Sequence, residues 1–144
     1  MKIPILIDDE SLLPQYMTEG AAGADVRACL ERATFIHPRE RVLINTGIRV
    51  KIPVGYEIQV RPRSGLALRH GITVLNSPGT IDSDYTGEIR VILINHGNRV
   101  IPITPGMRIG QLVVNRVVQA DWQICSDLPD TVRGQQGFGS TKHD

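Results

Sequence analysis

Short β-branched and alternating runs, separated by turn residues, constrain the fold of this chain more than any other feature of its sequence. Apolar and polar residues alternate in "IRVKI" (48–52) and "YEIQVR" (56–61), the period-2 pattern of strands with one buried face. Two further runs, "IRVILIN" (89–95) and "QLVVNRVVQ" (111–119), are nearly continuous and β-branched. The first of these suits a strand that is buried on both faces.

Turn residues stand between these runs, in "NTG" (45–47), "NSPG" (76–79), "NHGN" (95–98) and "TPG" (104–106). Many short strands at this spacing predict an all-β sandwich, jelly roll or partly closed barrel. The only stretch with a helical pattern is "SGLALRHG" (64–71), in which Ser64 is the expected N-cap and Gly71 the expected end.

The length of 144 residues fits one domain with a real core. Large aliphatic residues become scarce after Cys125. We therefore expect a single β-domain over residues 1–125 and a C-terminal arm over residues 126–144. The arm ends in "RGQQGFGSTKHD" (133–144), which has one aromatic ring and three glycines, and such a segment buries too little apolar surface to fold on itself.

Charge and composition exclude several classes of function. The formal net charge is +1 and charged residues make up 22%, so no broad attraction to nucleic acid is expected. No apolar stretch is long enough to cross a bilayer, and the N-terminus does not match a signal peptide, so no membrane association is expected. Cys29 and Cys125 form no CxxC or zinc pattern, which is typical of reduced thiols in a cytoplasmic protein.

Three stretches could carry chemistry, and for each the local pattern leaves a plain structural alternative open. "RPRSGLA" (61–67) could bind phosphate through arginines at a helix start, or could be a capped surface turn. "NSPGTIDSDYTGE" (76–88) could hold Asp82 as a general base, or could use its acids for turn formation only. "GAAGADVRA" (20–28) could direct the Asp25 carboxylate at a hydrated magnesium ion, or could be a tight strand turn.

Together and in order, five segments resemble the motifs of the all-β deoxyuridine triphosphatase (dUTPase) family. These are "AAGADVRA", "RPRSGLA", "GTIDSDYTG", "RIGQLV" and "RGQQGFGST", which run from residue 21 to residue 141. The resemblance implies an all-β jelly roll, or distorted β-barrel of the β-clip type, with one short helix and a flexible C-terminal arm. It also implies a homotrimer whose active sites are shared between chains, and hydrolysis of dUTP to dUMP and pyrophosphate.

The resemblance further implies roles for individual residues. Asp82 is the expected catalytic base, and Asp25 is expected to position Mg²⁺ through water. The expected phosphate contacts are Arg63, Ser64, Gly65 and Gln111, joined by Arg133, Gly139, Ser140 and Thr141 from the arm. Uracil and deoxyribose would meet Asn76, Thr80, Ile81, Tyr85 and a backbone group at Arg90, with Phe138 stacked on the base as part of a lid.

One residue departs from the family pattern, because Gln136 stands where the family tail commonly has a glycine. Two other functions remain possible on sequence grounds. A deoxycytidine triphosphate deaminase has a related "ID" turn, but alignment on Gly87 and Asn95 places Ile92 where that chemistry needs a carboxylate. A non-catalytic jelly-roll module that binds a nucleotide or protein is the second alternative, since fold alone does not define function.

Overall fold

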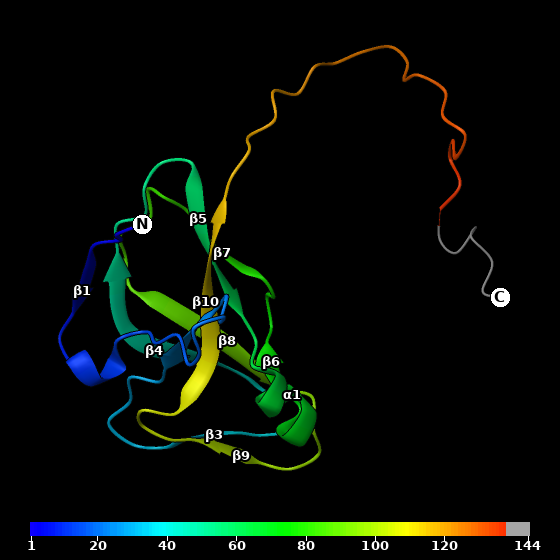
Figure 1. Cartoon of the computed structure of the whole chain (residues 1–144). Helices are drawn as coiled ribbons and strands as arrows, with labels where there is room; N and C mark the ends of the chain where they lie inside the picture. Colours follow the sequence, from blue (N-terminus) through cyan, green and yellow to red (C-terminus); the bar gives the residue numbers. More distant parts are fainter. Residues whose placement is uncertain (138–144) are drawn as a thin grey trace.

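The structure of the chain is a computed structural model, and it describes residues 1–137. In that range the strands form two four-stranded sheets and one two-stranded sheet, all antiparallel (Figure 1). The first sheet has the order β1 (Ile5–Ile7), β4 (Arg41–Val50), β8 (Ile89–Asn95), β6 (Ile72–Val74). The second has the order β2 (Ala24–Arg27), β10 (Arg108–Arg116), β5 (Tyr56–Arg61), β7 (Gly79–Ile81). The third pairs β3 (Thr34–Ile36) with β9 (Ile101–Ile103), and two short helices, η1 (Glu10–Leu12) and α1 (Ser64–His70), complete the elements.

One hydrophobic core joins the two larger sheets. Ile44 of β4 and Val91 of β8 are buried in the same cluster as Val60 of β5 and Ile109 of β10. Neighbours of Ile44, Val60 and Val91 along their strands are more exposed, so β4, β5 and β8 each turn one face inward. This arrangement is a two-sheet, jelly-roll-like fold, and it confirms the all-β class predicted from the sequence. The described strands do not close into a barrel.

Two sequence predictions about strands are wrong. The "NTG" stretch at 45–47 is not a turn between strands but an irregularity inside β4, where the register with β8 shifts between Asn45 and Ile48. Gly47 has a φ of 69°, which lets the chain kink without leaving the sheet. The second wrong prediction is that the strand at 89–95 is buried on both faces. Residues of β8 alternate between buried and more exposed, and Ile92 and Ile94 lie on a face that this chain does not fully cover.

Helix α1 begins one residue earlier than predicted. Arg63 occupies the N-cap position with extended backbone, without a side-chain cap hydrogen bond, and Ser64 is the first helical residue. The prediction of Ser64 as N-cap is therefore wrong. The predicted end is confirmed, because Gly71 adopts the left-handed conformation, with a φ of 67°, and its N–H donates to Ala67 and Leu66 carbonyls.

The chain leaves the body of the protein soon after β10 ends. Val117 donates its N–H to the carbonyl of Gly55, and residues 118–136 are exposed along a segment that runs away from the sheets (Figure 1). Large apolar side chains such as Trp122 and Ile124, which the sequence placed before the arm, are on this exposed segment. The domain boundary at residue 125 stays a prediction.

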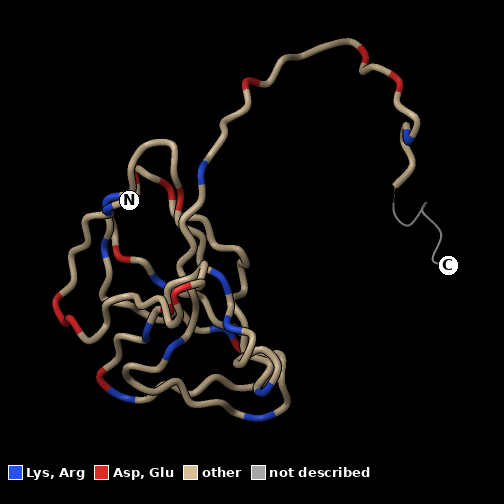
Figure 2. Tube along the Cα trace, viewed as in Figure 1, with Lys and Arg blue, Asp and Glu red and all other residues tan. Residues whose placement is uncertain are grey.

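Charged residues are interspersed over the body, and Lys or Arg do not gather on one face in the view of Figure 2. This distribution agrees with the small net charge of the chain. Within residues 1–137, no helix has both the length and the apolar character that crossing a membrane requires.

Candidate functional site

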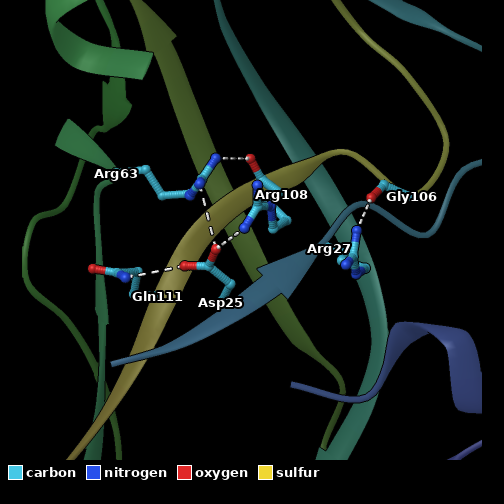
Figure 3. A network of polar contacts seen from close by, with 6 residues as sticks. All are labelled: Asp25, Arg27, Arg63, Gly106, Arg108 and Gln111. Carbon is cyan, nitrogen blue, oxygen red and sulfur yellow. Dashed lines mark hydrogen bonds and ion pairs between the residues drawn. The ribbon is translucent and has the colours of Figure 1, made fainter. Parts of the chain in front are cut away.

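A buried carboxylate lies at the centre of the most connected polar network in the structure (Figure 3). Asp25 is 3% exposed, and its Oδ2 lies 3.0 Å from Nη1 of Arg108 and 3.3 Å from Nη2 of Arg63. Its Oδ1 accepts a hydrogen bond of 3.0 Å from Nε2 of Gln111. One negative charge is therefore shared between two guanidinium groups, and the network retains an excess of positive charge.

Strand pairing brings these residues together from distant parts of the sequence. Asp25 of β2 lies directly opposite Gln111 of β10, and Gln111 lies opposite Arg61 at the end of β5. Arg63 follows two residues later, where the chain turns into α1, and its Nη1 donates to the carbonyl of Arg108 at 3.3 Å. Ser64 and Gly65 form the first turn of α1, beside Arg63. The sequence-predicted residues Asp25, Arg63, Ser64, Gly65 and Gln111 thus gather in one region, here named the Asp25 cluster.

Arg108 is a member of this cluster that the sequence reasoning missed. It stands three residues before Gln111 in the quoted segment "RIGQLV", and that proximity was the available signal. The register of β10 with β2 shifts between Arg108 and Gly110. This bulge breaks the regular alternation of side chains along β10. Arg108 lies beside Asp25 at the bulge, and alternation alone does not predict that position.

The Asp25 cluster offers few donors for the expected magnesium ion. Within the described part of the chain, no group of three or more His, Cys, Asp or Glu residues could hold a metal. Asp25 offers a single carboxylate, with both oxygens bonded to Arg63, Arg108 and Gln111. Magnesium in nucleotide sites keeps several waters and binds through one or two carboxylates together with substrate phosphates. The residues therefore fit an ion carried by a polyphosphate, with at most one carboxylate contribution from the protein.

A second candidate region is the hairpin that contains β7 and the turn after it. A hollow of about 230 Å³ is lined by Leu43, Thr80, Ile81, Asp82, Tyr85, Glu88, Arg90 and Ile92. Asp82 is exposed at the end of β7, and its carbonyl accepts the N–H of Tyr85 at 3.2 Å. It also lines a larger hollow of about 420 Å³ on the side of Tyr56 and Val117. We name this region the β7 hairpin.

The β7 hairpin contains most of the residues predicted to meet base and sugar. Thr80, Ile81, Tyr85 and Arg90 line the smaller hollow. Asn76 does not line it, but its Nδ2 lies 3.2 Å from where a Cβ on Gly79 would be, next to the start of β7. Leu43, Glu88 and Ile92 also line the hollow. Leu43 lies in no motif quoted above, Glu88 ends the stretch at 76–88 without a predicted role, and Ile92 was named only as the position where a deaminase needs a carboxylate.

The Asp25 cluster and the β7 hairpin lie at different places in the same sheet. Three strand spacings separate β2 from β7, and the pairs Gln111–Arg61 and Ile58–Ile81 are three residues apart along β5. At about 4.8 Å per spacing and 3.3 Å per residue, the Cα atoms of Asp25 and Ile81 are about 17 Å apart. The Asp25 carboxylate and the end of β7 are therefore not in contact within one chain.

The predicted arm residues fall partly outside the described range. Arg133 is exposed, and its Nε donates to the carbonyl of Gln136 within the same turn, far along the extended segment of Figure 1. The structure does not place Arg133 in either region. Phe138, Gly139, Ser140 and Thr141 lie outside the described residues.

The fold and the two regions define a class: an all-β protein in which one region pairs a buried carboxylate with two arginines and a second, separate region is a hairpin that carries an exposed aspartate. The dUTPase family model matches residues 9–142, and the chain belongs to the dUTPase family.

Similarity to individual proteins extends over nearly the whole chain. It is 60% identical over 136 residues to a deoxyuridine 5'-triphosphate nucleotidohydrolase of Chlamydia pneumoniae, covering 94% of each chain. It is 49% identical over 141 residues to a protein of the same name from Fusobacterium nucleatum, covering 98% of this chain and 97% of the other. In fold it is similar to the dUTPase of Staphylococcus bacteriophage 80alpha, with a TM-score of 0.82 and 22% identity, over 96% of this chain and 97% of that one.

Proposed function

We propose that the protein hydrolyses dUTP to dUMP and pyrophosphate, which removes dUTP before it can enter DNA and supplies dUMP for thymidylate synthesis. Similarity to curated deoxyuridine 5'-triphosphate nucleotidohydrolases across almost the full length carries this proposal. The Asp25 cluster and the β7 hairpin support it, since a nucleotide hydrolase needs a place for phosphate charge and a separate place for base and sugar.

The Asp25 cluster would bind the triphosphate. Arg63 and Arg108 present guanidinium groups that pair as well with phosphate oxygens as with a carboxylate. Ser64, Gly65 and Gln111 would add hydroxyl, backbone and amide donors. Because Asp25 already holds both guanidinium groups in place, little side-chain entropy would be lost when the phosphates arrive.

Magnesium is proposed to enter with the triphosphate. When bound there, Mg²⁺ would neutralise charge on the phosphate oxygens. Asp25 is the residue that would contact its waters, and transfer of one guanidinium from Oδ2 of Asp25 to a phosphate would free a lone pair of that oxygen for this contact.

Asp82 is the proposed general base. Its carboxylate would accept a proton from a water molecule as the water oxygen forms a bond to the α-phosphorus. The bond from that phosphorus to the oxygen bridging the α- and β-phosphates would break, and pyrophosphate would leave with the bonding electrons. The arginines would stabilise the charge that spreads over the phosphate oxygens, and no covalent enzyme intermediate is required.

The β7 hairpin would select the nucleoside. Backbone groups at Thr80 and Ile81, the Asn76 amide and the backbone at Arg90 would read the base, and cytosine would leave donors and acceptors unpaired. Tyr85 would pack against the deoxyribose. The arm would then close the site, with Phe138 on the uracil and with Arg133, Gly139, Ser140 and Thr141 at the phosphates. Gln136 would modify that closure rather than the reaction.

The deaminase alternative is not favoured by the lining of the hollow at the β7 hairpin. Ile92 lines it and cannot transfer protons. Two carboxylates line it: Asp82 is the proposed base of the hydrolysis, and Glu88 has its Oε1 engaged by the N–H groups of Thr46 and Gly47, at 3.2 Å and 2.8 Å. Both bonds anchor Glu88 to β4.

We further propose a homotrimer in which a site combines regions from different chains. The distance between Asp25 and Asp82 supports this proposal, because a general base must come within about 3 Å of the water that it deprotonates. Asp82 directly follows Ile81, whose Cα is about 17 Å from that of Asp25 by strand spacing, so one chain cannot serve one α-phosphorus with both.

Complementation tests the shared site. An Asp82→Asn chain and an Arg63→Ala chain, each inactive alone, are refolded together, and pyrophosphate release and oligomer mass are measured. Recovery of activity in mixed oligomers of three chains is the expected result. Mixed trimers that form but stay inactive would contradict sharing, and an active monomer would contradict the assembly.

The reaction itself is tested with dUTP, dCTP, dTTP and UTP in parallel, with magnesium, measuring pyrophosphate, orthophosphate and ammonia. Pyrophosphate from dUTP alone is expected. Ammonia from dCTP would establish the deaminase instead, and no product from any of the four would leave the non-catalytic binding module. We also propose a cytoplasmic location, in keeping with the free thiols of Cys29 and Cys125.

A further inference from the structure

Tyr85 lies where a side chain on Gly87 would have to be. A Cβ built on Gly87 would be 2.5 Å from Oη of Tyr85, 2.7 Å from Cζ and 3.0 Å from Cε2. Carbon and oxygen atoms that are not bonded do not approach this closely, so the ring occupies its place only because residue 87 has no side chain. The backbone of Gly87 thus forms one support of the ring.

The same hydroxyl end of the ring is also held through Glu88. Oη of Tyr85 donates a hydrogen bond of 2.9 Å to the carbonyl of Glu88. The Glu88 carboxylate in turn accepts the N–H groups of Thr46 and Gly47 at the irregular point of β4. Ring, turn and sheet are therefore connected in one chain of contacts.

These contacts matter because the hydrophobic core does not hold the ring. Tyr85 is 41% exposed and is absent from the core cluster, so it can swing outward at small cost to stability. Exclusion of one hydroxyl group from a sugar site, in contrast, depends on a wall that stays in place. A displaced ring would leave folding intact and change selectivity.

We propose that Gly87 and Glu88 are positioning residues that fix the Tyr85 ring and thereby set the preference for 2'-deoxyribose over ribose. The inference rests on the proposed function, in which Tyr85 packs against the sugar. It adds two determinants of selectivity outside that contact. Gly87 permits the position of the ring, and the Glu88 carboxylate anchors the turn that carries it.

The first test compares kcat and KM for dUTP and UTP in the wild type and in Gly87→Ala. We expect the ratio of kcat/KM for dUTP to that for UTP to fall about tenfold or more, because the displaced ring no longer blocks the 2'-hydroxyl. Gly20→Ala is the matched control, since no atom lies within 4 Å of a Cβ there and its φ is not positive. That variant should keep the ratio and the melting temperature of the wild type.

The second test separates positioning from folding through Glu88. Glu88→Gln keeps an oxygen acceptor for the two N–H groups and should retain the ratio, whereas Glu88→Ala removes it and should lower the ratio. If Gly87→Ala does not fold, this pair still decides the question. A Gly87→Ala or Glu88→Ala enzyme that folds and keeps its preference for dUTP would overturn the inference. A fall in kcat/KM by the same factor for dUTP and UTP would also overturn it. A wild type inactive on dUTP would instead overturn the proposed function.

Discussion

Replacement of Asp25 by asparagine isolates the charge at the centre of the Asp25 cluster, because the two side chains have nearly the same shape. The asparagine oxygen can face Arg63 and Arg108, and its amide group can face Gln111. Rotation of the Gln111 amide then offers an oxygen in place of its N–H group. The hydrogen bonds are kept, and the negative charge is lost.

The size of the effect follows from burial. Removal of one partner from a buried ion pair costs about 3–5 kcal/mol. The arginine side chains of this cluster keep 25% and 35% of their surface exposed, so water can take over part of their solvation. We therefore expect Asp25→Asn to lower the free energy of unfolding by about 2 kcal/mol, and Asp25→Ala by about 4 kcal/mol. For a chain of this length the first value corresponds to a fall in Tm of about 4–8 °C.

Urea unfolding measures the change, at one fixed protein concentration because the proposed assembly would make stability depend on concentration. Asp121→Asn is the matched control, because Asp121 is exposed on the segment after β10 and makes no ion pair within the described residues. An Asp25→Asn protein within about 0.5 kcal/mol of the wild type would refute the reasoning, because a change that small is typical of surface substitutions.

Three further predictions concern other parts of the chain. Asp82→Asn should lower the rate of pyrophosphate release from dUTP about 100-fold or more, while calorimetry still detects dUTP binding, because loss of a general base removes catalysis and not affinity. Unchanged turnover would mean that another group is the base. Gly71→Ala should lower the free energy of unfolding by about 3 kcal/mol or more, because the φ of Gly71 is 67° and a Cβ there would lie 2.5 Å from a backbone nitrogen. Gly106→Ala should lower it by only about 1–2 kcal/mol, because Gly106 has a φ of 72° but no atom within 4 Å of a Cβ. Equal unfolding energies for the two variants would contradict this. Hydrogen bonds from Ser11 lower the pKa of Asp9 below its ordinary value of 3.8. The cap therefore contributes stability at pH values above 3.8, and this contribution is lost as the pH falls through the lower pKa of the folded state. An NMR titration of the Asp9 carboxyl should give a midpoint below 3.8.

Long strands with a regular pattern could be predicted from the sequence, but the bulges and tertiary contacts that join them could not. "YEIQVR" and "IRVILIN" became β5 and β8 with their predicted bounds, because β-branched content and alternation are local properties. The kink at Gly47 was predicted as a turn, since asparagine and glycine signal both turns and bulges, and only pairing with β8 decides between them.

The same division applies to the candidate site. Asp25, Arg63 and Gln111 were identified through a resemblance in five motifs, and the structure brings them together. Arg108 was missed because its position depends on the bulge in β10 rather than on a local pattern. Glu88 was missed for a similar reason, since its carboxylate acts on β4, about forty residues away in sequence.

The two regions of the site differ in a way that explains which of them should tolerate change. The Asp25 carboxylate is almost completely buried, so a substitution there should disturb the stability of the sheet as well as the phosphate binding proposed for the cluster. The β7 hairpin is largely exposed, and Tyr85 is held by one hydrogen bond and by the absence of a side chain at Gly87. Substitutions in the hairpin should therefore alter which nucleotide is accepted without unfolding the protein. Because the Cα atoms of Asp25 and Ile81 lie about 17 Å apart in one sheet, a substitution in one region should leave the other region of the same chain largely unchanged.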